Sequence, residues 1–220
     1  MNIFKLFSVL FFTLTSGLTQ ILAVEVSPSN NPLERLIQGN NRYVTSTTVC
    51  HEDWSAKRSA VVESQKPFAI IVACSDSRVP PEIVFDQSLG NLFVVRVAGN
   101  VVDDFAIGSI EYAVKVLGAD LILVLGHSNC GAVNAALSGM KFDNHIQDVL
   151  NAIQPAVNIT KGDTGDLLEK TTKANVKLVT EKLKNSKAML ANLIDKGSLR
   201  VLGGYYNLTT GKVEILDKTQ

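Results

Sequence analysis

Cysteine is scarce in this 220-residue chain: there are three, Cys50, Cys74 and Cys130, and no two of them form a Cys-x-x-Cys pair. An odd number means that at least one thiol has no partner for an internal disulfide. The missing Cys-x-x-Cys pair argues against a protein of thiol–disulfide exchange. Each thiol is therefore expected to be paired, exposed, or protected on a metal.

Net charge is also lacking, because 21 basic side chains balance 21 acidic ones. This balance gives no support for nucleic-acid binding or for long-range steering of an anion. The sequence has no internal repeat and no low-complexity segment. With 46% hydrophobic residues, its length fits one ordinary domain with a substantial core.

Residues 1–23 differ from the rest of the chain. One early basic residue, Lys5, precedes an apolar run and then small and polar residues, which is the layout of a secretory signal peptide. The run is short for a membrane span, and an uncleaved amphipathic anchor is the alternative. Ala23 is a candidate cleavage site, although Ile21 stands where a small residue is preferred. We expect a periplasmic or secreted protein whose domain, residues 24–220, has no stable membrane span.

Three continuous apolar runs, at 68–73, 92–97 and 121–125, predict strands that are covered on both faces. A helical segment at 103–119 lies between the second and third, and another helix opens after the third. This alternation predicts an α/β fold with a mainly parallel central sheet flanked by helices. Further helices are expected at 31–44, 55–64, 144–157 and 168–196, with a closing strand pair around Thr210 and Gly211.

Reactive side chains follow two of these strands. Cys74 comes directly after the first, and His127 and Cys130 come after the third, in the stretch GHSNCGA. Sites in parallel sheets gather at the carboxyl ends of the strands. Two thiolates and one imidazole suit zinc and leave a fourth position open. A Cys74–Cys130 disulfide is the alternative, and it leaves His127 without a role.

The motifs CSDSR (74–78) and GHSNCGA (126–132), with LERLIQGNNRYV, GSIEYAV and GGYYNL, resemble the β-class carbonic anhydrases. The resemblance covers most of the domain. It implies the fold of that family, a homodimer or dimer of dimers, and one zinc ion per chain bound by Cys74, His127 and Cys130. It also implies reversible hydration of carbon dioxide to bicarbonate and a proton by a zinc-bound hydroxide.

Asp76 and Arg78 match the catalytic dyad of that family. The aspartate is expected to orient the hydroxide, and the arginine to keep the aspartate off the zinc through a two-pronged charge-assisted bond. One branch of the family has an inhibitory bicarbonate site and usually carries Trp three residues before the first zinc cysteine. That position is Ile71 here, which favours the open form of the site.

Four further residues match the substrate pocket of the family. Gln65 stands where one branch has a hydrogen-bond donor to substrate, Phe93 and Tyr112 match the apolar wall, and Gly131 matches a backbone amide donor. Ala98 stands where a bulkier aliphatic residue is frequent, which leaves the size of the pocket open. A dry wall with one or two donors suits a small apolar substrate.

Two other functions fit the same scaffold. One is hydrolysis of a related molecule such as carbon disulfide, and the other is a zinc-stabilised binding protein without turnover. The second predicts a broken dyad or a filled pocket, and the sequence has neither. The pair Cys50–His51 is interpreted as no metal site, because adjacent residues do not easily bind one ion together.

Overall fold

The computed structural model describes residues 29–50, 53–186 and 189–217. The expected signal peptide, residues 1–23, lies outside these residues, and so does His51. Across the described part of the chain, no helix is long and apolar enough to cross a membrane.

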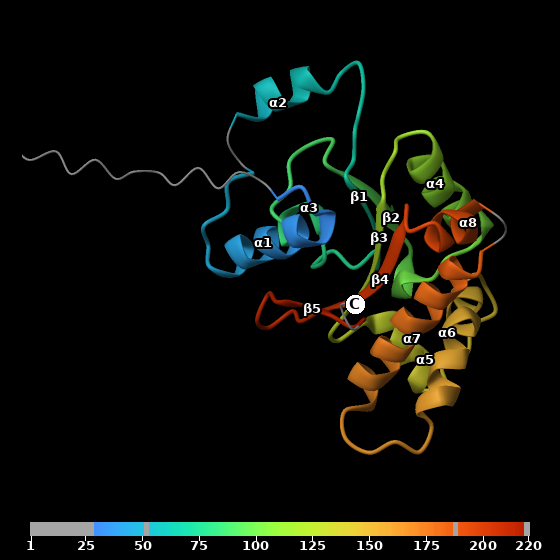
Figure 1. Ribbon diagram of the computed structural model, residues 1–220. Coiled ribbons are helices and arrows are strands. Elements are labelled where there is room, and N and C mark those ends of the chain that lie inside the picture. Colours follow the sequence, from blue (N-terminus) through green and yellow to red (C-terminus); the bar gives the residue numbers. More distant parts are fainter. Residues whose placement is uncertain (1–28, 51–52, 187–188, 218–220) are drawn as a thin grey trace, which may run out of the picture.

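A five-stranded sheet in the order β2-β1-β3-β4-β5 forms the centre of the molecule (Figure 1). Strands β1 to β4 run parallel to one another, and β5 is antiparallel to β4. The predicted α/β fold with a mainly parallel sheet is therefore confirmed. The strands are β1 (Ala69–Ala73), β2 (Leu92–Arg96), β3 (Leu121–His127), β4 (Arg200–Tyr206) and β5 (Val213–Ile215).

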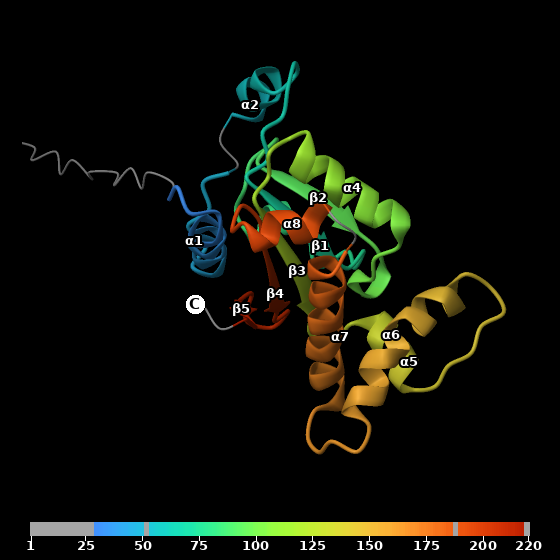
Figure 2. The ribbon, with the colours of Figure 1, turned by 45° about the vertical axis from the view of Figure 1, so that its right-hand side comes forward.

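Helices cover both faces of the sheet, as Figures 1 and 2 show. Along β1, Ile70 and Val72 join the core beneath α4, α7 and α8, whereas Ile71 joins the core beneath α1. Side chains alternate between the two faces of a strand, so burial on both faces explains the continuous apolar runs. The helices are α1 (Pro32–Val44), α2 (Trp54–Ala60), α3 (Pro81–Val84), α4 (Asp104–Lys115), α5 (Gly131–Leu137), α6 (Ile146–Thr160), α7 (Leu167–Lys184) and α8 (Met189–Asp195).

The observed elements differ from the predicted ones at several ends. Strand β3 continues to His127 instead of ending at 125, because β4 pairs with it up to Tyr206. The helical pattern at 168–196 is divided into α7 and α8. Helix α2 ends at Ala60, earlier than predicted, and buries none of its residues.

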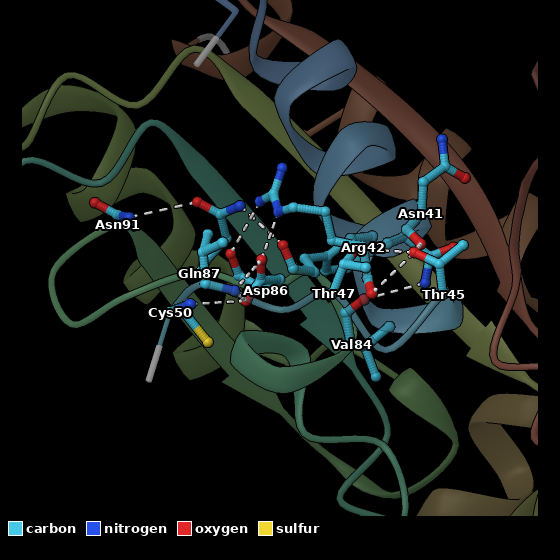
Figure 3. Close-up of polar contacts among 12 residues, drawn as sticks. Asn41, Arg42, Thr45, Thr47, Cys50, Val84, Asp86, Gln87 and Asn91 are labelled. Carbon is cyan, nitrogen blue, oxygen red and sulfur yellow. Dashed lines mark hydrogen bonds and ion pairs between the residues drawn. The ribbon is translucent and has the colours of Figure 1, made fainter. Parts of the chain in front are cut away.

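A buried aspartate attaches α1 to the chain that follows α3 (Figure 3). The carboxylate of Asp86 accepts a hydrogen bond from Arg42 Nε of α1 at 2.5 Å. It also accepts backbone N–H bonds from Val49 at 3.1 Å and from Cys50 at 3.0 Å. Since the Asp86 side chain is fully buried, these donors replace the water that an ionised carboxylate requires.

Candidate metal centre

The sheet brings the three predicted ligands together at the carboxyl ends of β1 and β3. These strands are adjacent and parallel. Cys74 directly follows β1, His127 is the last residue of β3, and Cys130 is the N-cap residue of α5. One ligand atom from each residue lies within 4.8 Å of the other two, and all three residues are buried.

The donor atoms fit a zinc ion. His127 Nδ1 lies 2.9 Å from the carbonyl oxygen of Ser128, so Nδ1–H donates there and Nε2 keeps its lone pair. Nε2 is buried without a hydrogen-bond partner among the described residues, which is costly unless an ion or ligand meets it. Zinc bonds of about 2.0–2.3 Å place tetrahedral donor atoms about 3.5–3.8 Å apart. The observed group needs only a small contraction to reach that geometry.

The two thiols act on each other. Cys74 and Cys130 are not joined by a disulfide bond, so the alternative of a Cys74–Cys130 disulfide is wrong. Hydrogen bonds, first from Cys130 and also from the Gly99 amide, lower the pKa of Cys74 to about 4 against the effect of burial. The sulfur of Cys74 and burial raise the pKa of Cys130. The metal-free pair therefore holds one proton, and a divalent cation relieves the repulsion between two thiolates.

Asp76 and Arg78 lie beside this group and bind each other. Arg78 donates from Nε to Oδ1 at 2.9 Å, from Nη2 to Oδ2 at 2.7 Å, and from its backbone N–H to Oδ1 at 3.0 Å. Chiefly because of these side-chain bonds, the pKa of Asp76 lies well below its usual range. Oδ2 is 3.9 Å from His127 Nε2. An anionic carboxylate thus faces the metal position while both its oxygens are engaged by the arginine.

The predicted pocket residues do not gather at one place. Gly131 begins α5 next to Cys130, and a Cβ atom added to it would meet no other group within 4 Å. Phe93 of β2 pairs with Ile70 of β1. Ile70 lies four residues before Cys74, which is about 13 Å along the strand at about 3.3 Å per residue, so Phe93 is distant from the ligands of its own chain. Gln65 is exposed and precedes the amino end of β1.

Tyr112 also lies away from the ligands of its own chain. It follows the start of α4, Asp104, by eight residues, which is about 12 Å along a helix. The helix begins near the carboxyl ends of the strands and runs back over the sheet (Figure 2). The tyrosine is 51% exposed. Its ring is therefore available to a neighbouring molecule.

Sequence reasoning did not identify two groups that hold the Cys74 loop. Arg96, at the end of β2, donates to the backbone carbonyls of Cys74 at 3.0 Å and of Asp76 at 2.5 Å. The N–H of Gly99 donates to Cys74 Sγ at 3.2 Å. A glycine after a strand is a weak signal for such a close approach, and the arginine gave no signal.

Comparison with known proteins agrees with this geometry. The family model described as carbonic anhydrase matches residues 69–213. Carbonic anhydrase 2 of Mycobacterium tuberculosis is 38% identical over 197 residues, covering 86% of this chain and 95% of that protein. The β-carbonic anhydrase of Coccomyxa, solved in complex with acetazolamide, is 28% identical to this chain and superposes with a TM-score of 0.70. The match covers 86% of this chain and 88% of the Coccomyxa chain.

A tetrameric β-carbonic anhydrase from Sordaria macrospora shares the fold, with 23% identity and a TM-score of 0.68. The match covers 84% of this chain and 97% of the Sordaria macrospora chain. The family model spans more than half of the chain, and the mycobacterial relative matches nearly all of its own length. This chain therefore belongs to the β-class carbonic anhydrases, the zinc-dependent lyases that interconvert carbon dioxide and bicarbonate.

Proposed function

We propose that the reversible hydration of carbon dioxide takes place at a zinc centre bound by Cys74, His127 and Cys130, with Asp76 and Arg78 as the catalytic dyad. One observation carries this proposal: His127 Nε2 is buried without a partner among the described residues, close to two thiols and 3.9 Å from a carboxylate. Bound zinc supplies the Lewis acidity that makes water a nucleophile near neutral pH.

The chain's own groups orient the reaction. Asp76 is ionised at neutral pH, so it accepts a hydrogen bond from the attacking water and fixes the direction of its lone pair. Arg78 occupies both carboxylate oxygens and keeps Asp76 from becoming a fourth ligand. Together with Ile71 in place of Trp, this supports an open site at neutral pH. The N–H of Gly131, in the first turn of α5, has no acceptor within its own helix and is free to meet the substrate.

We propose that the enzyme works as a dimer or a dimer of dimers, in which Gln65, Phe93 and Tyr112 serve the metal centre of the partner copy. Their distance from the ligands of their own chain supports this arrangement. Helix α4 and its C-cap residue also carry an exposed apolar stripe, formed by Phe105, Tyr112 and Val116. The Sordaria macrospora enzyme, which shares this fold and is tetrameric, supports the proposal of an oligomer.

The function is tested by stopped-flow measurement of carbon dioxide hydration between pH 6.5 and 9, with zinc content determined in parallel. Fast turnover at neutral pH with about one zinc per chain is expected. Turnover only at alkaline pH, with zinc present, would mean that Asp76 closes the site. Zinc without turnover at any pH would refute the hydratase and favour another substrate, such as carbon disulfide, or a binding protein.

The assembly is tested by light scattering on Phe105→Asp, with Lys115→Asp on the same helix as the matched charged control. A charge inside an apolar interface disfavours association, so the first variant is expected to dissociate, retain zinc and lose most turnover. A dissociated variant with full turnover would remove the partner's residues from the site.

We also propose that residues 1–23 direct export to the periplasm or beyond the cell. The support is their layout in the sequence. Cell fractionation with N-terminal sequencing of the mature protein tests the proposal, and recovery of the full-length chain in the cytoplasm would contradict it.

A further inference from the structure

The sulfur of Cys74 accepts a hydrogen bond from the backbone of another segment. Gly99 lies in the 3-10 turn Ala98–Asn100 that follows β2, and its N–H donates to Cys74 Sγ at 3.2 Å in a buried setting. Gly99 has a φ of 65°, a conformation that favours glycine. A Cβ atom there would lie 2.7 Å from Ile153 Cδ1. Both the backbone conformation and the lack of space therefore favour glycine at this position.

The side chain of Asn175, in α7, binds the carbonyl group of the same glycine. Asn175 Nδ2 donates to the carbonyl oxygen of Gly99 at 2.8 Å. The asparagine is 1% exposed and lies 76 residues further along the chain. Its amide therefore fixes the carbonyl of Gly99, while the N–H of the same residue meets the sulfur. A buried bond of this kind is not readily replaced by water.

We propose that Asn175 is a positioning residue of the metal centre: it holds Gly99 so that the Gly99 N–H stays directed at Cys74 Sγ. A hydrogen bond to a thiolate withdraws charge from the sulfur, so less charge reaches the metal. Two thiolates cancel the formal charge of a zinc ion, and this bond restores part of its Lewis acidity. Outer groups that orient metal ligands in this way typically change metal affinity or activity 10–100-fold. The inference rests on the proposed metal centre.

Lys182 offers a matched control on the same helix. Its Nζ donates to the carbonyl of Val102 at 2.7 Å, so it also ties α7 to the segment that follows β2. Among the described residues, its side chain makes no hydrogen bond to Gly99. If Asn175 only ties α7 to this segment, replacing Asn175 and replacing Lys182 should have the same effect on the metal centre. If Asn175 positions Gly99, only the replacement of Asn175 should change it.

The test is the absorption spectrum of the Co²⁺-substituted full-length enzyme in Asn175→Leu, Lys182→Met and wild type, with Co²⁺ affinity from chelator competition. Loss of the N–H···S bond raises the energy of the sulfur electrons. The thiolate-to-cobalt band is therefore expected to move to longer wavelength in Asn175→Leu and to stay in place in Lys182→Met. Co²⁺ binding by Asn175→Leu is expected to be about tenfold weaker, because the ligand loop is no longer held in position. An unchanged band in Asn175→Leu, or equal shifts in both variants, would overturn the proposal.

A second measurement does not depend on the folding of Asn175→Leu. In the ¹¹³Cd-substituted wild type, a scalar coupling between the Gly99 amide proton and the metal is expected through Cys74 Sγ. The coupling is expected to weaken in Asn175→Asp at a pH where the new carboxylate is ionised, since the side chain keeps its volume but then has no proton to donate to the carbonyl. Cadmium bound without this coupling refutes the inference alone, whereas a wild type that binds neither metal refutes the metal centre and the inference with it.

Discussion

Asp76 and Asp86 are each paired with an arginine, and the two pairs occupy opposite kinds of environment. Asp76 and Arg78 come from one loop, and their side chains are 16% and 53% exposed. Asp86 meets Arg42 from a helix 44 residues away, and the two side chains are 0% and 26% exposed. The same two residue types thus form a pair open to solvent beside a metal position and a buried connection between elements.

The difference between the pairs shows how burial assigns a role to a charged group. The hydrogen bonds of Arg78 lower the pKa of Asp76, so the carboxylate stays anionic next to the proposed metal centre. For Asp86, burial opposes the charge, and bonds from Cys50 and Arg42 outweigh it to lower the pKa. Removing a buried carboxylate that several donors meet destabilises the fold, because the donors lose their acceptor. A carboxylate that borders open space can instead meet a bound molecule.

The largest expected effect comes from Asp86→Ala. The change leaves Arg42 and the backbone N–H groups of Val49 and Cys50 without their acceptor. We expect the free energy of unfolding to fall by about 3 kcal/mol, measured by urea unfolding at fixed protein concentration. A loss below about 1 kcal/mol would show that Asp86 is not a structural tether.

Asp76→Asn is expected to act on turnover and not on the fold. The amide keeps the shape but loses the charge that orients water, so kcat/KM for carbon dioxide hydration should fall about 100-fold with zinc content unchanged. Asp86→Asn is the control at a temperature where it remains folded, and it should retain turnover. Comparable losses in both variants would abolish the distinction between the pairs.

Acid should weaken the fold partly through Asp86. Its folded pKa is lowered, so between the folded and unfolded pKa values the unfolded state binds more protons. The stabilisation is present above the unfolded value of about 3.9 and is lost as the pH falls towards the folded one. Unfolding free energies of metal-free protein should therefore drop less steeply below about pH 4 in Asp86→Asn than in wild type. Parallel curves would contradict this assignment.

The smallest effect is expected from Cys50→Ser, which tests whether the thiol beside Asp86 takes any part in the proposed metal centre. Burial, and then Asp86, raise the pKa of Cys50 to about 11, so this thiol is protonated at neutral pH and is not a metal ligand in the proposed centre. Zinc content and turnover should match wild type, whereas Cys74→Ser should lose most of its zinc. Zinc loss in Cys50→Ser would place a second metal position near Asp86.

Much of the fold and of the candidate site was predictable, because it depends on local patterns. Strands β1, β2 and β3 are apolar runs with two buried faces, so their positions were correct to within two residues. Cys74, His127 and Cys130 lie at the ends of two of these strands, and adjacent parallel pairing brings them together. The end of β3 was missed because its last residues form a strand only through pairing with β4.

The sequence by itself determined the order of the elements, the candidate ligand set and the family, since each is encoded in short stretches of chain. Only the tertiary structure decided that Asn175 meets Gly99, that Arg42 meets Asp86, and that Phe93 lies far from the metal position of its own chain. Contacts between distant residues depend on how helices and strands pack in three dimensions. No local pattern encodes them, because each hydrogen bond is satisfied by any donor that the packing brings within reach.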